Sequence, residues 1–150
     1  MSDAQTRAAV LRAARLWLDT PYCHQASSRG AGTDCLGLIR GVWRDVFNAE
    51  PERPPAYTPD WAEVNGAETL LQAAQRWLTP IARGAAQPGD IMVFRMHTDA
   101  PCKHIGILSM NDRVLHAYWG KAVVESFLVP YWQKRWAYSF AFPPLQRSEL

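Results

Sequence analysis

Apolar residues recur at helical spacing along the first part of the chain. The first stripe falls on one face of a predicted helix and consists of Val10, Ala14, Trp17 and Leu18. This helix should end near Asp19, because Pro21 disfavours helical geometry in the residue before it. Ser2 and Gln5 have the spacing of a capping box at its start.

A second helix is predicted from about Asp34 to Phe47. Its buried stripe consists of Leu36, Ile39, Trp43 and Val46. Thr33 or Asp34 would cap its first turn. Gly37 and Gly41 lie four residues apart, so one strip of this helix has no side chains and another element's backbone can approach it closely.

The pattern changes in the second half of the chain. A third helix is predicted from about Ala67 to Leu78, after the proline-stiffened stretch PERPPAYTPD at 51–60.

Beyond Pro88-Gly89, five segments rich in β-branched and aromatic residues predict strands, namely DIMVFR, HIGILSM, VLHAYW, AVVESFLV and RWAYSFAF. Helices followed by strands indicate an α+β fold with an antiparallel sheet of about five strands. We expect a single domain over residues 1–150.

Composition excludes several classes of function. Apolar residues make up 48% of the chain and charged residues 20%, as in ordinary soluble domains. The net charge of +2 comes without a basic run, so nucleic acid is not an expected partner. No apolar stretch approaches the roughly 18 residues of a membrane span. Arginines interrupt the N-terminal apolar stretch, so we expect a protein made in the cytoplasm without a signal peptide, with three reduced cysteines.

Cys35 is the candidate nucleophile. It lies in the predicted first turn of the second helix, and a helix N-terminus together with a nearby imidazole would favour its thiolate. Cys23 lies in a loop, and Cys102 follows a proline at a strand entry. The alternative for Cys35 is a buried structural thiol.

Two histidines could provide the partner. His104 opens one predicted strand and His116 lies in the next. Their numbers add up to the even value 220, so they share a face of an antiparallel hairpin only if the turn has an odd number of residues. A three-residue turn centred on Asn111 would place them diagonally, about 7–8 Å apart in backbone, whereas a two-residue turn would place them on opposite faces. Asn111 and Asp112 tolerate left-handed geometry, which suits the three-residue turn.

Five short motifs carry a family resemblance. They are TPY at 20–22, TDCLGL at 33–38, PGDIMVF at 88–94, HIGI at 104–107 and LHA at 115–117. In this order they resemble the NlpC-type cell-wall cysteine peptidases, which have a papain-like fold. The wording DCLGLIRGVW is most similar to peptidases encoded with phage tails and gene transfer agents.

The resemblance implies a catalytic role for each matching residue. Cys35 would be the nucleophile, His104 the general base and His116 the polar group that orients the imidazole. Tyr22 matches the tyrosine whose hydroxyl faces the active site, where it would stabilise the oxyanion together with the Cys35 N–H. The family cleaves the γ-D-glutamyl–diaminopimelate bond, or a similar amide, in peptidoglycan stem peptides, without a metal or organic cofactor.

Two positions depart from the family pattern. Leu36 follows the cysteine where many members have serine, and His24 stands where an aromatic residue is usual. Both positions should border the substrate cleft, so these departures affect substrate preference rather than the chemistry.

Two other functions are compatible with the sequence. Cys23, Cys102 and His104, with His24 and Cys35, could supply a zinc site, although paired ligands such as CxxC are missing. A non-catalytic tail or wall-binding module that retains the fold is the second alternative.

The phage-tail resemblance also makes a prediction about location. A wall hydrolase without an export signal needs another carrier, and the resemblance implies phage-like tail proteins as partners. We expect a virion-like tail that brings the enzyme to the periplasm. Tyr57 and Trp61, on the proline-stiffened stretch, either pack on the body or anchor such a partner.

Overall fold

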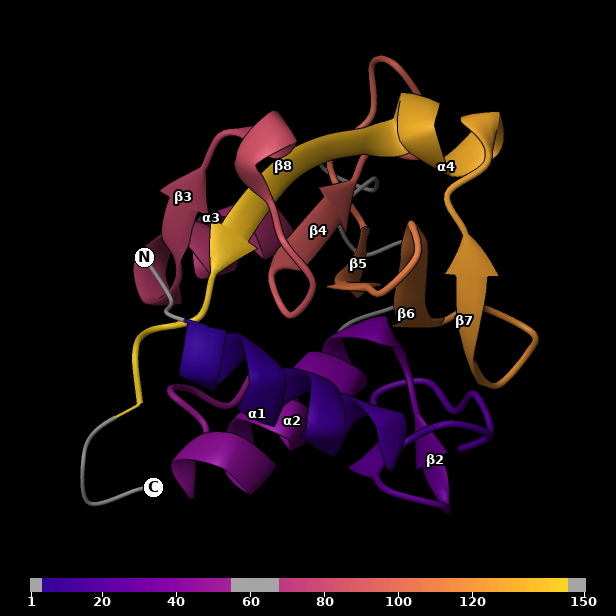
Figure 1. The fold of residues 1–150 in the computed structure, drawn as a ribbon. Coiled ribbons are helices and arrows are strands. Elements are labelled where there is room, and N and C mark those ends of the chain that lie inside the picture. The colour runs from indigo at the N-terminus through magenta and orange to yellow at the C-terminus, as the bar shows by residue number, and fades with distance from the viewer. Residues whose placement is uncertain (1–3, 55–67, 146–150) are drawn as a thin grey trace.

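A computed structural model describes residues 4–54 and 68–145 of the chain (Figure 1). The helices are α1 (Ala4–Arg15), α2 (Cys35–Phe47), α3 (Thr69–Trp77) and α4 (Pro130–Arg135), with a 3-10 turn η1 (Arg83–Ala85). The strands are β1 (Ser27–Ser28), β2 (Gly32–Thr33), β3 (Thr79–Ile81), β4 (Ile91–Phe94), β5 (His104–Ser109), β6 (Arg113–Ala117), β7 (Val123–Phe127) and β8 (Trp136–Ala141). The predicted α+β order is confirmed.

The main sheet is antiparallel throughout and has the strand order β3-β8-β4-β5-β6-β7. It contains the five predicted strands and one more, β3, which the residue pattern did not predict. Pro80 gave no strand signal because proline cannot donate to a ladder, and β3 accommodates it at the edge of the sheet. A small second sheet, β1-β2, and the helix α4 were also not predicted.

The helices were predicted more closely. α2 begins at Cys35 and ends at Phe47, and α3 lies within the predicted range. α1 ends at Arg15 rather than near Asp19, because the chain continues in tight turns from Leu16 to Asp19, where Asp19 adopts a left-handed φ of 70°. Ser2, Tyr57 and Trp61 lie outside the described residues.

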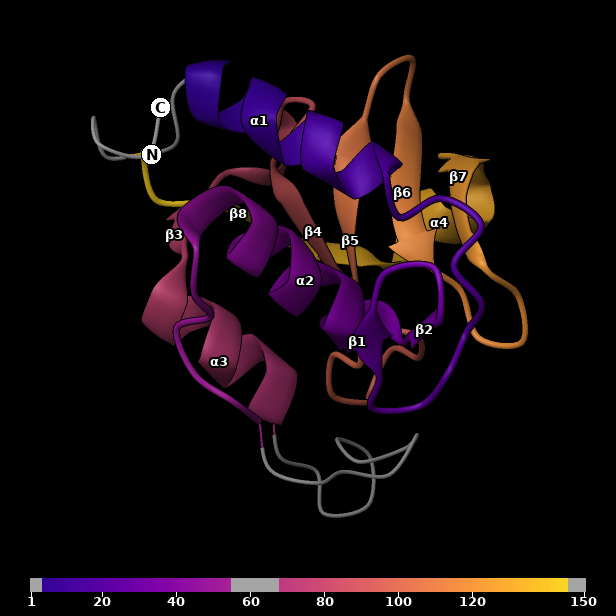
Figure 2. The same ribbon diagram turned by 90° about the horizontal axis from the view of Figure 1, so that it is seen from below.

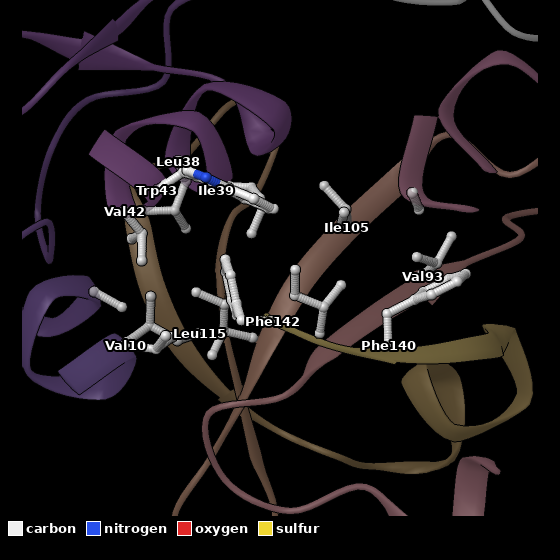
Figure 3. Packing of buried hydrophobic residues seen from close by; sticks show 14 of the residues in the cluster. Val10, Leu38, Ile39, Val42, Trp43, Val93, Ile105, Leu115, Phe140 and Phe142 are labelled. Atoms are coloured by element: carbon white, nitrogen blue, oxygen red, sulfur yellow. The ribbon is translucent and has the colours of Figure 1, made fainter. Parts of the chain in front are cut away.

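Two apolar clusters lie on opposite faces of the sheet. The larger one joins α1 and α2 to alternate residues of the strands, among them Val93, Ile105, Ile107 and Leu115 (Figure 3). Figure 2 shows α1 and α2 side by side across this face. The smaller cluster includes Met92, Phe94, Leu108 and Val114 and is covered by Trp132 of α4. The central strands β4, β5 and β6 are therefore buried on both faces, apart from Arg113 at the start of β6.

The glycine strip of α2 permits the expected close contact. A Cβ at Gly37 would overlap the carbonyl oxygen of Ala26, which is backbone from the loop before β1. A Cβ at Gly41 would instead overlap the ring of Trp17. The predicted backbone approach is therefore confirmed at Gly37, whereas Gly41 makes room for an aromatic side chain.

Within the described residues, no helix is both long and apolar enough to cross a membrane.

Candidate catalytic site

Cys35 is the first residue of α2, as predicted. Asp34 caps the helix: its Oδ1 accepts from the Gly37 N–H at 2.7 Å, and its Oδ2 accepts from the Gln25 N–H at 2.8 Å. The same carboxylate therefore holds both the helix start and the loop that precedes β1. Cys35 is partly buried, which leaves its thiol at the boundary between core and solvent.

The thiol meets the sheet at the beginning of β5. Cys35 Sγ lies 3.9 Å from the carbonyl oxygen of Lys103, and the backbone amide of Ile105 also interacts with the sulfur. These two residues flank His104. The N-terminus of α2 and the first residue of β5 are thus brought together by the packing of α2 on the sheet.

The resting thiol does not have the electrostatics that the sequence led us to expect. Burial, and secondarily the Asp34 carboxylate, raise the pKa of Cys35 to about 12, although backbone amides act in the opposite direction. The helix start acts in the predicted direction, because the backbone amides of Cys35 and Leu36 lower the pKa of the thiol. Burial, and after it the Asp34 carboxylate that caps the helix, outweigh these amides.

The β5–β6 hairpin has the register that brings the two histidines together. Its pairs are Ile107 with Leu115, Leu108 with Val114 and Ser109 with Arg113, whose residue numbers each add up to 222. Asn111 and Asp112 in the turn have left-handed φ values of 59° and 54°. The predicted three-residue turn is confirmed.

The two imidazoles are hydrogen-bonded to each other. His104 Nε2 lies 2.7 Å from His116 Nδ1. On its other side, His116 Nε2 lies 3.0 Å from Ser126 Oγ in β7. A chain of three side chains therefore runs across β5, β6 and β7, and it begins at His104, the residue between the two whose backbones contact the thiol.

Ser126 was not identified from the sequence. It pairs with Val114, so it lies diagonally opposite His116 on the same face of the β6–β7 pair. The register that reveals this depends on the loop between Ala117 and Val123, whose length and turn type the sequence did not specify. Ser126 could therefore be found only from the pairing of β6 with β7, because a single serine in a strand gives no sign of a functional role.

Aromatic rings enclose the histidine pair. Phe94 and Trp132 have centroids 5.5 Å from the His104 ring, and Tyr118 stacks on His116 at 5.7 Å. Trp132 also contacts His116 edge-on at 4.9 Å. Burial lowers the pKa of His116 to about 4, and burial with the neighbouring His116 and Lys103 lowers the pKa of His104 well below its usual value. Both imidazoles are neutral at pH 7.

Tyr22 lies beside the thiol. Its backbone bridges Thr33 and its N–H donates to the Lys121 carbonyl, so it connects the α2 entry with the β6–β7 loop. Burial, then the proximity of Cys35 and Asp34, raise the pKa of the Tyr22 phenol. The hydroxyl stays protonated and can donate a hydrogen bond.

The remaining two predicted site residues flank the helix start. His24 Nδ1 lies 3.9 Å from Asp34 Oδ2, and the side chain is 33% exposed. Leu36 is partly buried and packs against the larger apolar cluster. His24 therefore borders the cap of α2 from the solvent side, while Leu36 faces the protein body.

The cysteines of the alternative zinc site differ in their surroundings. Cys23 is exposed, and Cys102 is fully buried with its N–H donating to Glu68 Oε1 at 2.6 Å. Burial, followed by the effect of Glu68, raises the pKa of Cys102 to about 11, although Arg95 opposes it. In residues 4–54 and 68–145, no three His, Cys, Asp or Glu side chains gather into a group that could hold a metal ion.

An open hollow of about 670 Å³ lies elsewhere, against α1 and the end of α2. Among the side chains that line it are Arg12, Leu16, Arg29, Asp45 and Val46. None of the predicted site residues lines it, and its lining contains no histidine or cysteine. It therefore offers no nucleophile and base for covalent chemistry.

Comparison with known proteins agrees with this geometry. Residues 19–140 match the NlpC/P60 family. A probable endopeptidase NlpC from Escherichia coli K12 is 31% identical over 119 residues, which cover 79% of this chain and 66% of that protein. The chain thus spans slightly less than two thirds of the length of this curated relative.

Solved structures support the fold. A lipoprotein-like NLP/P60 family protein from Staphylococcus aureus superposes with a TM-score of 0.67 at 21% identity, over 93% of this chain and 42% of that one. The NlpC/p60 domain of the peptidoglycan hydrolase SagA gives a TM-score of 0.64 at 18% identity, over 91% and 98% respectively. The family match extends from the residue before Thr20 to β8 and includes Cys35, His104 and His116, and the chain belongs to the NlpC/P60 family.

Proposed function

We propose that this chain is a thiol-dependent endopeptidase that cleaves stem-peptide amides of peptidoglycan. The observation that carries the proposal is the contact of the Cys35 thiol with the backbones of Lys103 and Ile105, on either side of His104, whose ring is hydrogen-bonded to His116. Since Nε2 of His104 is engaged by His116, Nδ1 is the ring nitrogen left to take the thiol proton. Nucleophile, base and orienting group then follow the order of a papain-like triad.

The neutral resting state determines how the first step proceeds. With the pKa of Cys35 raised and that of His104 lowered, an ion pair does not form in advance. The proton therefore passes from Sγ to His104 as Sγ attacks the substrate carbonyl, and the electron pair of the C=O bond moves to oxygen. The Cys35 N–H and the Tyr22 hydroxyl donate to this oxyanion.

The later steps return the enzyme to its starting state. His104 gives the proton to the leaving amine as the C–N bond breaks, which leaves a thioester on Cys35. Water then attacks the thioester while His104 accepts its proton. The C–S bond breaks, a carboxylic acid is released, and the proton returns to Cys35.

The bond between γ-D-glutamate and diaminopimelate is the proposed target. The family resemblance supports it, and two similar proteins are described as a probable endopeptidase and a peptidoglycan hydrolase. Two synthetic stem peptides that differ only in a γ- or an α-linked glutamate would test the linkage. We expect cleavage of the γ-linked peptide and none by Cys35→Ser. Preferential cleavage of the α-linked peptide would contradict the assignment of the bond while leaving the thiol chemistry intact.

For delivery, a phage-like tail is the proposed carrier, and periplasmic peptidoglycan is the proposed site of action. The support is the resemblance of DCLGLIRGVW, residues 34–43, to peptidases encoded with tails and gene transfer agents. We expect the protein to co-purify with assembled particles. Isolated protein should digest purified wall but not lyse intact diderm cells from outside. Efficient lysis by isolated protein would contradict delivery by a tail.

A further inference from the structure

We propose that Ser126 is a positioning residue that holds the His116 ring, and through it the His104 ring, in one orientation. This inference rests on the proposed function in one respect, namely that His104 acts as the base toward Cys35. Ser126 lies in β7, two strands away from His104, and reaches it only through His116.

The hydrogen-bond distances define a continuous path. His104 Nε2 to His116 Nδ1 is 2.7 Å, and His116 Nε2 to Ser126 Oγ is 3.0 Å. His116 is fully buried, so its ring nitrogens cannot exchange these partners for bulk water without local opening. Tyr118 stacks on the face of the His116 ring with an interplanar angle of 12°, and Trp132 meets that ring edge-on. The aromatic neighbours therefore pack against the ring while its two nitrogens face His104 and Ser126.

Catalysis requires one particular arrangement of protons along this path. To accept the thiol proton at Nδ1, neutral His104 must carry its own proton at Nε2 and donate it to His116 Nδ1. His116 must then carry its proton at Nε2, where Ser126 Oγ accepts it. A neutral imidazole has one N–H, so each choice in the chain determines the next.

The reversed arrangement would disable the base. If His116 carried its proton at Nδ1, it would donate to His104 Nε2, and the His104 proton would move to Nδ1. That nitrogen could then no longer accept the proton of Cys35. The Ser126 hydroxyl can accept from a protonated His116 Nε2 or donate to an unprotonated one, so it holds the His116 ring in either arrangement. Without it, a buried ring nitrogen of His116 loses its hydrogen-bond partner, which is destabilising and frees the ring to turn away from His104.

A matched pair of variants isolates the hydroxyl. Ser126→Thr keeps the oxygen, whereas Ser126→Val has nearly the same shape without it, and both residues suit a strand. We expect Val to lower kcat on purified stem peptide by about tenfold or more with KM nearly unchanged, and Thr to remain within about threefold of wild type. Ser126→Ala provides a second hydroxyl-free variant that adds no bulk, should Val disturb the fold.

The spectroscopic readout does not depend on activity. In long-range 15N–1H spectra of the full chain at pH 7.5, wild type and Thr should show His116 protonated at Nε2 and His104 protonated at Nε2. Val and Ala remove the partner of His116 Nε2, so they should shift the ring resonances of His116 and, through the shared hydrogen bond, those of His104. Unchanged ring resonances in a folded Val or Ala variant, or a kcat equal to that of Thr, would overturn the role of Ser126. A wild-type chain with the expected tautomers that cleaves no wall peptide would instead contradict the proposed function.

Discussion

The two halves of the candidate site are built in different ways. The helix half presents Cys35 at the boundary with solvent, anchored by backbone contacts and by the Asp34 cap. The sheet half buries His104 and His116 among aromatic rings, and side-chain hydrogen bonds together with this ring packing orient them. The proposed nucleophile is thus positioned by secondary structure, and the proposed base by side-chain contacts across three strands.

This difference has an energetic consequence. Each half keeps its ionisable group neutral: burial and Asp34 raise the pKa of the thiol, while burial lowers the pKa of both imidazoles. In the proposed mechanism, proton transfer therefore accompanies attack on the substrate instead of preceding it. Substitutions in the helix half should mainly change thiol reactivity, and those in the sheet half should change proton transfer and pH-dependent stability.

The strongest test of the sheet half replaces its histidines one at a time. His104→Ala should lower kcat/KM by about a thousandfold or more, because it removes the proposed general base. His116→Asn should lower it much less, since an amide oxygen can still accept from His104 Nε2. Steady-state kinetics on a stem peptide would measure both variants. Equal losses would mean that the roles of the two histidines are misassigned.

Stability should depend on pH through the same buried imidazoles. The pKa of His116 is about 4 in the folded protein, whereas an exposed histidine titrates near 6.5. Between these two pH values the unfolded chain binds more protons than the folded one. The contribution of His116 to the free energy of unfolding is therefore complete above about pH 6.5 and decreases as the pH falls toward 4. The loss from His116 is on the order of 3 kcal/mol.

Urea denaturation at pH 7.5, 5.5 and 4.5 would measure this dependence. His116→Asn removes the titrating group and should flatten the pH dependence, although His104 contributes in the same direction. An equally steep dependence in that variant would show that His116 is not the group responsible.

The approach of the Ala26 loop to α2 should be sensitive to a single methyl group. Gly37→Ala would place a Cβ against the Ala26 carbonyl oxygen and should lower the free energy of unfolding by about 1–3 kcal/mol. Gly84→Ala is the matched control, because nothing lies within 4 Å of the added Cβ. Thermal or urea denaturation distinguishes them, and equal stability of the two variants would contradict the close packing.

The smallest expected effect concerns the charge beside the thiol. Asp34→Asn keeps an oxygen that can accept from the Gly37 N–H, gives up the acceptor of the Gln25 N–H, and removes the negative charge that raises the pKa of Cys35. We expect alkylation of Cys35 by iodoacetamide at pH 8 to become several-fold faster, in the direction of a lower pKa. Peptide mapping would separate Cys35 from Cys23, whose exposed thiol serves as the internal control. A slower reaction at Cys35 would show that the cap matters more for access than for charge.

Local sequence patterns predicted much of this site. The cap predicted at Thr33 or Asp34, the helix predicted from about Asp34 and the hairpin around Asn111 each depend on residues close together in sequence. The structure confirms the helix and the hairpin and places the cap at Asp34. β3, α4 and Ser126 were missed for a different reason. Pro80 and Pro130 gave no strand or helix-interior signal, and the partner of Ser126 is determined by strand pairing across a loop of unspecified geometry.

The pKa of Cys35 is raised, although the position of this residue at a helix start predicted a lowered value. A helix terminus favours a thiolate only when its amides outweigh desolvation and nearby negative charge. The sequence shows Asp34 next to Cys35, but the capping role that places its carboxylate beside the sulfur, and the depth of burial, emerge only from the fold.

The central claim is that Cys35 cleaves an amide of the peptidoglycan stem. Mass spectrometry of muropeptides after digestion of purified wall tests it most directly, with Cys35→Ala as the matched control and circular dichroism to verify its fold. The account predicts products cut between γ-D-glutamate and diaminopimelate with wild type and none with Cys35→Ala. Identical product profiles from the two proteins would contradict it.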